Sequence, residues 1–409
     1  MTRVAHLTPY PTRQPRHGGQ LRAHHTARAL EASGHTVERI SVFSAAHYPP
    51  TDDEPAVDLE PVWPRMRYRA IWQVADMMSC ELAATDTACF AAFAARLDAA
   101  RPELVVLEEP WLWPALRRWR AAHATVPVIF NSNNIDSRAK AAILADAGVA
   151  EAAQIVAEVA ALEHDLARAA AGASATTEED AAVMRGWTDS PVVVARNGTV
   201  LRRTAHLFGV LPAPLDPTQR FVLFVGSAHP PNASGFLAMA LPALPVLRSN
   251  ERIVVAGEVC NLLTPELAAG GPNFMVRDRL VLLGHVSELA LDCLLANASG
   301  ILLPIAYGGG SNLKTAEALV SGLPVVGTSQ AFRGFMEFAG LPQVARADTP
   351  EAFAAGIRRA LDDAGAPRQV PEARQLLWEN TLRPLVDLVA AIAGAAMPYG
   401  GRDTAQRRS

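Results

Sequence analysis

The sequence predicts an α/β protein made of two domains, each built on a parallel sheet. The chain has 409 residues, half of them hydrophobic, which is more than one hydrophobic core usually supports. Short apolar runs of strand length alternate with helical stretches along the chain. Several of these runs end directly in glycine, which is typical of the strand-to-helix turns of nucleotide-binding folds.

The first predicted unit is strand, helix, strand. A strand at 4–7 precedes a polar loop, Gly18 and Gly19 open a helix that ends before Gly34, and a second strand covers 36–43. A glycine pair at a helix start lets backbone amides approach an anion. We therefore count Gly18 and Gly19 as candidate ligand-binding residues.

Residues 45–100 have less pattern, with a proline-containing polar loop followed by an alanine-rich helical stretch. Three aromatic residues in this part could stack on a ligand, although aromatic side chains at such spacing more often belong to a core. They are Trp63, Tyr68 and Trp72.

Two further buried strands, at 104–107 and 126–130, are each followed by polar residues. Ligands of open α/β sheets bind at the carboxyl ends of the strands. The polar residues at these ends are Glu108, Glu109, Asn133 and Asp136. Asn133 could hydrogen-bond a ligand; alternatively, this Asn/Asp segment caps a following helix at 138–144.

The rest of the first domain alternates helices and strands. Helices are expected at 151–169 and 178–186, and strands near 173–176 and at 192–194. Residues 204–219 contain four prolines or glycines, and we take them as the linker.

The second domain opens with an apolar strand at 221–225, followed at once by Gly226. This loop has no Arg or Lys, so His229 is its only candidate phosphate contact; the alternative is a histidine in a surface loop. Strands at 252–257 and 281–286 also run into glycine, at Gly257 and Gly284.

The most informative segment is Tyr307–Arg333. It follows a buried strand at 300–305, has three consecutive glycines at 308–310, and continues into a helix at 313–321. A glycine loop at a helix start makes an anion site, because free amides and about half a positive charge from the helix dipole meet there. The groups expected to face a phosphate are the amides of Ser311, Asn312 and Leu313 and the ammonium of Lys314.

The sequence EALVSGLPVV, Glu317–Val326, resembles the C-terminal signature of glycosyltransferase family four. These are nucleotide-sugar enzymes of the GT-B fold, an α/β architecture with two Rossmann-like domains facing each other across a central cleft. The resemblance implies that Glu317 holds the donor ribose, as the second glutamate of a Glu-x7-Glu pair. Gly309 stands at the position of the first glutamate, as in a family variant in which a Gly-x-Gly and a lysine replace the acidic start.

The resemblance extends to other segments. Gly18 and Gly19 resemble the glycine pair that opens these enzymes, and Gly284-His285-Val286 resembles the segment beside the nucleobase. Asn133 takes the position of a family histidine that lies near the reacting sugar, with Asp136 in the position of the acid. The family also places acceptor recognition in the first domain.

The resemblance divides the chain into five parts. They are an N-terminal Rossmann-like acceptor domain at 1–203, a linker at 204–219, a C-terminal Rossmann-like donor domain at 220–373, a C-terminal helix at 374–392 that packs back toward the first domain, and a tail at 393–409 that we expect to be disordered.

The implied function is transfer of a sugar from a nucleoside diphosphate sugar to a saccharide, lipid-linked or small-molecule acceptor, with retention of configuration. Polysaccharide biosynthesis is the commonest family context. The candidate catalytic residues are Asn133, Lys314 and Glu317. The candidate donor-binding residues are Gly18, Gly19, Gly226, His229, Gly284, His285, Val286, Gly309, Gly310, Ser311, Asn312 and Leu313.

Several other classes are disfavoured. The sequence has no Asp-x-Asp triplet and no histidine cluster at ligand spacing, so we expect neither a metal nor another cofactor. A net charge of −4 argues against nucleic acid as a partner. Four cysteines without CxxC spacing and the lack of a long apolar run predict a reduced cytoplasmic protein, with peripheral contact to the inner face of the membrane left open.

Two alternatives stay open at this point. Gly309 and Asn133, where the family often has Glu and His, fit a non-catalytic or weakened GT-B protein that binds a sugar or a scaffold. A nucleotide-sugar epimerase would need acid and base carboxylates near the sugar, and Glu108 and Glu109 are the candidates.

Overall fold

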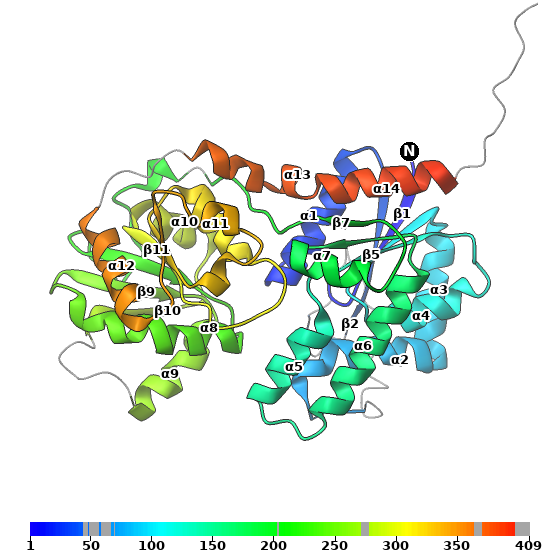
Figure 1. The fold of residues 1–409 in the computed structure, drawn as a ribbon, viewed down its shortest axis with the longest axis horizontal. Helices are drawn as coiled ribbons and strands as arrows, with labels where there is room; N and C mark the ends of the chain where they lie inside the picture. The colour runs from blue at the N-terminus through cyan, green and yellow to red at the C-terminus, as the bar shows by residue number, and fades with distance from the viewer. Residues whose placement is uncertain are drawn as a thin grey trace, which may run out of the picture. The chain divides into compact units, whose positions relative to one another are not determined.

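The computed structural model describes residues 1–43, 48, 57–58, 67–68, 70–202, 204–270, 278–363 and 370–396. The chain forms two compact units (Figure 1). The first comprises Met1–Ala195 together with the chain from Leu382 onward, and the second comprises Arg196–Thr381. Residues 204–219, predicted as the linker, fall within the second unit.

The first unit contains a seven-stranded sheet whose strands pair in parallel in the order β3-β2-β1-β4-β5-β6-β7. Strand β4 is buried over its whole length, because helices cover both faces of such a sheet. The strands are β1 Arg3–Thr8, β2 Thr36–Phe43, β3 Val57–Asp58, β4 Leu104–Glu108, β5 Val128–Asn131, β6 Gly172–Ala175 and β7 Val192–Val194.

The helices of this unit follow the predicted alternation, and α4 adds one that was not predicted. They are α1 Gly18–Ala32, the 3₁₀ turn η2 Trp72–Val74, α2 Ala75–Thr85, α3 Thr87–Ala100, α4 Trp113–Arg120, α5 Asp136–Asp146, α6 Ala152–Ala169 and α7 Glu178–Arg185.

The chain returns to the first unit through α14, Arg383–Ala396 (Figure 1). Leu385 and Val389 are buried in one cluster with Val4 and Ile129 of the sheet. The helical segment predicted from 374 is instead broken into a 3₁₀ turn, η9 Pro371–Leu376, the short α13 Trp378–Thr381, and α14. Pro384 accounts for part of this break, because proline has no N–H to continue a helix that starts upstream. Helix α14 continues to Ala396, past the predicted start of the tail at 393, and residues 397–409 lie outside the described residues.

The second unit contains a six-stranded parallel sheet in the order β10-β9-β8-β11-β12-β13. Its strands are β8 Arg220–Val225, β9 Glu251–Ala256, β10 Leu280–Gly284, β11 Gly300–Leu303, β12 Val325–Gly327 and β13 Val344–Arg346. Its helices and helical turns are η3 Ala205–Leu207, α8 Pro230–Gly235, η4 Phe236–Ala240, η5 Leu241–Val246, α9 Val259–Gly270, α10 Glu288–Asn297, α11 Leu313–Ser321, η7 Ser329–Phe332, η8 Met336–Phe338 and α12 Pro350–Asp362, followed by η9 and α13.

Both sheets have the same kind of strand order, in which the direction of winding reverses once. The reversal lies between β1 and β4 in the first unit and between β8 and β11 in the second. Loops leave such a point in opposite directions and open a crevice at the carboxyl ends of the strands, where doubly wound folds bind ligands. The fold therefore indicates where a site should lie in each unit.

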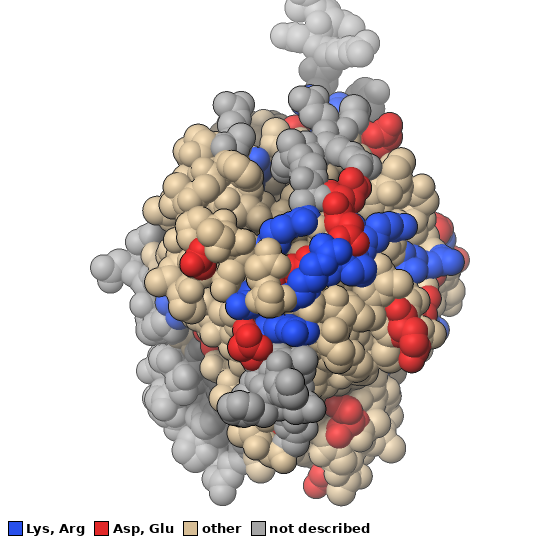
Figure 2. Space-filling view, turned by 90° about the vertical axis from the view of Figure 1, so that its left-hand side faces the viewer, with Lys and Arg blue, Asp and Glu red and all other residues tan. Residues whose placement is uncertain are grey.

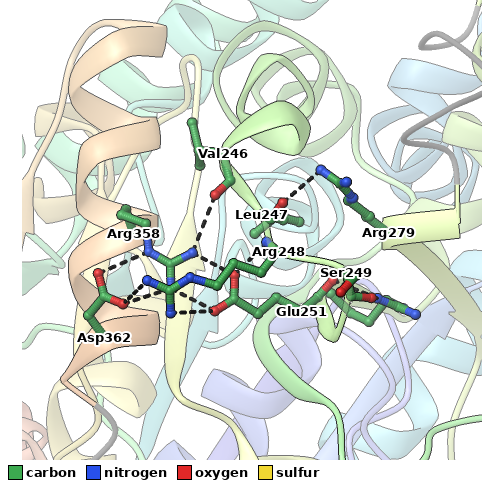
Figure 3. A network of polar contacts seen from close by, with 9 residues as sticks. Val246, Leu247, Arg248, Ser249, Glu251, Arg279, Arg358 and Asp362 are labelled. Carbon is green, nitrogen blue, oxygen red and sulfur yellow. Dashed lines mark hydrogen bonds and ion pairs between the residues drawn. The ribbon is translucent and has the colours of Figure 1, made fainter.

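Some charged side chains away from these edges form ion-pair networks. Figure 2 shows blue basic and red acidic side chains next to each other on one face of the molecule. Figure 3 shows such a network, in which Arg358 of α12 donates to both carboxylate oxygens of the buried Glu251 and to Asp362. Arg248 also lies within ion-pair distance of both carboxylates. This network ties α12 to the start of β9.

No helix in the described part of the chain combines the length and the apolar character needed to cross a bilayer.

Candidate active site

The loop between β11 and α11 has the geometry that its glycines predict. Gly308 has φ 151° and Gly310 has φ 62°, values that residues with a side chain rarely adopt. Asn312 caps α11 by accepting a hydrogen bond from the amide of Lys314, 3.2 Å from its Oδ1. The helix ends at Gly322 in the left-handed conformation.

Lys314, in the first turn of α11, reaches to α8, the helix that follows β8. Its ammonium donates a hydrogen bond to Oδ1 of Asn232, at 2.7 Å. Burial lowers the pKa of Lys314 to about 8, against the opposing influence of the Glu317 carboxylate. The structure therefore holds a basic side chain beyond the carboxyl ends of β8 and β11, where the winding of the sheet reverses.

Gly226, directly after β8, has a packing role. A side chain there would place its Cβ 2.8 Å from a methyl group of Val259, and one at Gly257 would lie 2.3 Å from the carbonyl oxygen of Gly226. These glycines let the loops after β8 and β9 pass close together. His229 is exposed and is the N-cap residue of α8.

Ser311 is held by a residue outside the predicted set. The amide of Asn197 donates to Oγ of Ser311 at 2.9 Å, and its side-chain amide donates to the carbonyl of Ser311 at 2.7 Å. Both residues are buried. Asn197 thus anchors the end of the glycine loop, while Leu313 starts α11 with a partly buried side chain.

Glu317 lies one turn beyond Lys314 on α11. Its Oε1 accepts a hydrogen bond from Nε of Arg202 at 2.9 Å. Arg202 also donates to Glu288 and Asp292 of α10. Although burial disfavours its charge, these carboxylates raise the pKa of Arg202 above its usual range. Arg202 therefore orients the glutamate that was predicted to hold the ribose.

The segment predicted to lie beside the nucleobase follows β10, at the edge of the sheet. Gly284 has φ 67°, and its carbonyl oxygen accepts a hydrogen bond from the amide of Gly257 at 2.7 Å. His285 is exposed, with Nδ1 3.6 Å from a carboxylate oxygen of Glu258, and Val286 is partly buried against the core. Two strands separate this segment from β11.

In the first unit, α1 begins at Gly18 and is capped by His17. A Cβ on Gly19 would lie 2.5 Å from the hydroxyl of Tyr10. Gly19 therefore allows α1 to start against Tyr10, which gives this glycine a packing reason.

Glu108 is fully buried and accepts from His6 at 2.8 Å and from Asn131 at 2.6 Å. Asn131 in turn accepts from Arg22 at 3.0 Å. This network binds β1, β4, β5 and α1 together. Of the two candidate carboxylates, Glu108 is therefore the structural one.

Glu109 is partly exposed at the end of β4 and has φ 58°, an unusual value for a residue with a side chain. Its carboxylate accepts from Asn133 at 2.7 Å, from Trp111 at 2.8 Å and from Tyr10 at 3.2 Å. Burial, reinforced by the charge of Asp76, raises the pKa of Glu109 to about 7. The structure thus places Asn133 beside a carboxylate poised to titrate near neutrality.

The expected Asn/Asp helix cap is not formed. Ile135 is the N-cap residue of α5 and makes no side-chain cap. The carboxylate of Glu163, on α6, instead accepts the amides of Asp136 and Ser137 at 2.6 and 3.1 Å. The interpretation of Asn133 and Asp136 as caps is therefore wrong, because a distant glutamate supplies the acceptor.

The three aromatic residues that could stack on a ligand have different surroundings in the structure. Trp63 lies outside the described residues. Tyr68 donates its hydroxyl to Glu158 at 3.2 Å. Trp72 leaves 62 % of its surface exposed at the start of η2, so its side chain is not a core residue.

The structure brings together Asn232, Lys314 and the glycine loop in the second unit, and Tyr10, Glu109 and Asn133 in the first. Sequence reasoning missed Asn197, Arg202, Asn232 and Arg333. Arg333 is the last residue of the segment Tyr307–Arg333 and has no role in the sequence prediction, and Asn232 lies in α8, directly after the loop that follows β8. Within the described ranges, no three His, Cys, Asp or Glu side chains are grouped so that they could hold a metal ion.

Two family models match the chain. "Glycosyl transferases group 1" matches residues 219–363, and "Glycosyl transferase 4-like domain" matches residues 17–198. No curated protein sequence matches significantly.

Solved structures match over almost the whole chain. Sucrose-phosphate synthase from Thermosynechococcus elongatus superposes with a TM-score of 0.67 at 15 % identity, covering 96 % of this chain and 99 % of that one. Trehalose 6-phosphate synthase from Burkholderia multivorans gives 0.66 at 14 % identity, covering 97 % and 100 %. WaaG, a glycosyltransferase involved in lipopolysaccharide biosynthesis, gives 0.59 at 14 % identity, covering 97 % and 100 %. At these identities the likeness shows the fold, which is GT-B.

The two matched models account for both units, and each unit has the strand order of a Rossmann-like domain. The chain belongs to the GT4-type glycosyltransferases and is an enzyme of glycosyl transfer.

Proposed function

We propose that this enzyme transfers a sugar from a nucleoside diphosphate sugar to a hydroxyl of a saccharide, lipid-linked or small-molecule acceptor, with retention at the anomeric carbon. The observation that carries the donor class is the ammonium of Lys314, held by Asn232 next to a glycine loop and a helix start. A cation, backbone amides and a helix dipole together favour a diphosphate.

In the proposed reaction, the bond between the anomeric carbon and the donor phosphate oxygen breaks, and the acceptor oxygen bonds to the same carbon. The acceptor hydroxyl proton leaves with the diphosphate or passes to solvent. The difficult event is departure of the diphosphate, and Lys314 and the loop amides would stabilise the charge that develops on it. This scheme requires no metal ion.

Glu317 is the proposed partner of the ribose hydroxyls. Arg202 engages one of its carboxylate oxygens, and a carboxylate can accept further hydrogen bonds. Gly284, His285 and Val286 remain the proposed neighbours of the base, and Gly18 and Gly19 remain proposed amide donors.

The acceptor is proposed to bind at the carboxyl edge of the first unit. Tyr10, Glu109 and Asn133 are hydrogen-bonded to one another there, a set that suits a neutral hydroxyl. The proposed location is the cytoplasm, at the inner face of the membrane; the similar WaaG is involved in lipopolysaccharide biosynthesis.

The test is thermal stabilisation of the purified protein by UDP, GDP, ADP and their sugars, since a ligand that binds the native state raises its melting temperature. We expect a shift with one nucleotide that is lost in Lys314→Ala. No shift with any nucleotide would contradict the donor class. With the donor known, NMR of the product gives its anomeric configuration, and inversion would contradict retention.

A further inference from the structure

Arg333 follows η7, beyond β12, and extends its side chain back to the glycine loop. Its three guanidinium nitrogens donate to three consecutive carbonyls, those of Gly308, Gly309 and Gly310. Gln330 adds a second hydrogen bond to the carbonyl of Gly308, at 3.1 Å. One side chain from a later turn therefore holds three peptide groups in sequence.

This arrangement determines where the loop amides point. In a planar trans peptide, the carbonyl of one residue and the N–H of the next point in opposite directions. Because the carbonyls of 308–310 turn toward Arg333, the amides of Gly309, Gly310 and Ser311 turn away from it. Among the described residues, no acceptor is found for the amides of Gly309 and Gly310. Such successive outward amides form an anion-binding surface.

The loop needs an external restraint because of its composition. Glycine loses more conformational freedom on ordering than any other residue, and three glycines stand in sequence here. Gly308 and Gly309 are exposed, so packing does not order them. A loop that is ordered before binding avoids paying this entropy when the ligand arrives.

We propose that Arg333 is a positioning residue that holds the glycine loop so that the amides of Gly309, Gly310 and Ser311 face the donor diphosphate. The proposal rests on the proposed function, because it assigns the ligand of the same site. It goes beyond the sequence prediction by giving the order of the loop to a side chain outside it.

The experiment compares the wild type with Arg333→Ala, Arg333→Lys and the matched control Arg346→Ala, an exposed arginine at the end of β13. The probe is the nucleoside diphosphate that stabilises the wild type most, and its Kd is measured by calorimetry. We expect Arg333→Ala and Arg333→Lys both to bind at least tenfold more weakly and the control to bind as the wild type does. Guanidinium ion at tens of millimolar should partly restore the nucleotide affinity of Arg333→Ala. The same addition should leave the affinity of Arg333→Lys low.

A second readout needs no ligand. Backbone order parameters of ¹⁵N-labelled glycines report motion on the ps–ns timescale. We expect Gly309 and Gly310 to be ordered in the wild type and mobile in Arg333→Ala, with the melting temperature of the free protein little changed.

Three outcomes would overturn the proposal. Full affinity in Arg333→Ala would remove any role in binding. Full nucleotide affinity in Arg333→Lys would show that a positive charge at this position is sufficient for binding, as expected if the side chain contacts the phosphate directly. Unchanged order parameters would show that the loop is rigid without Arg333. If the wild type binds no nucleotide, the proposed function fails and the phosphate role with it, while the order parameters still report whether Arg333 restrains the loop.

Discussion

The ammonium of Lys314 lies 2.7 Å from the side-chain carbonyl oxygen of Asn232, a residue 82 positions earlier in the chain. This contact joins α8 and α11, the helices that follow β8 and β11, at the reversal of the sheet. Asn232 accepts the hydrogen bond without neutralising the charge, so the cation remains available to an anionic ligand.

Substitution of Asn232 by Asp tests this relationship. A carboxylate would pair with Lys314 and compete with the diphosphate, so we expect nucleotide affinity to fall about tenfold, or about 1.4 kcal/mol. Calorimetric titration with the stabilising nucleotide measures it. Asn250→Asp, at an exposed position of the same unit, serves as the control. Equal affinity of Asn232→Asp and the wild type would argue that the ligand does not contact Lys314.

Nucleotide binding should weaken at alkaline pH. Burial lowers the pKa of Lys314 to about 8, so the free enzyme loses this charge as pH rises above that value, whereas a bound diphosphate favours the charged form. We expect Kd to rise about tenfold between pH 7 and pH 9, because at pH 9 about one site in ten is protonated. A pH series of titrations checks this. Lys314→Ala should bind weakly at every pH, and a similar slope in that variant would assign the effect to another group.

The pKa of Glu109, raised to about 7, predicts a pH-dependent stability. The folded state then binds a proton more tightly than the unfolded state does. This contribution is full below pH 4.5 and is lost as pH rises through 7. The wild type therefore loses stability between pH 5 and pH 8, whereas Glu109→Gln does not. Allowing for partial exposure, we expect the free energy of unfolding of Glu109→Gln to rise by on the order of 1–2 kcal/mol relative to that of the wild type over this range.

Urea unfolding of the two proteins at both pH values gives this difference directly. The exposed Glu38→Gln should show no such trend. A constant difference between Glu109→Gln and the wild type would contradict the raised pKa.

Helix α14 should stabilise the first unit. Leu385 is 1 % exposed in the cluster with Val4 and Ile129, and truncating a buried leucine to alanine costs about 2–5 kcal/mol. We expect Leu385→Ala to lower the melting temperature of the first unit, measured by calorimetry. The exposed Asp387→Ala on the same helix is the control, and equal effects of the two would mean that α14 is not packed as described.

Sequence reasoning predicted the strands closely. The predicted strand at 36–43 coincides with β2, and the predicted helix at 313–321 coincides with α11. Each has a local signal: the strand follows the glycine that ends the preceding helix, and the helix follows a glycine loop with a capping residue. The helical pattern alone does not predict the break before α14; its local signal is Pro384, which has no N–H to continue a helix from upstream.

The candidate site was predicted less completely. Lys314 and Gly308–Gly310 were found because a glycine loop at a helix start is a local signal. The side chains that hold them carry no such signal. Asn197, Asn232 and Arg333 contact the loop region from distant positions, and their role depends on which strands are neighbours.

The sequence by itself determined the two-domain α/β class, the glycine loop and its lysine, because strand alternation, helix periodicity and turn chemistry are set by residues a few positions apart. The tertiary structure decided which partner each functional group has. Glu163 rather than Asn133 caps α5, Arg202 orients Glu317, and Arg333 holds the glycine carbonyls. The physical reason is that hydrogen-bond partners must lie within about 3 Å, and only the order and crossovers of the strands bring residues that are far apart in the chain to that distance.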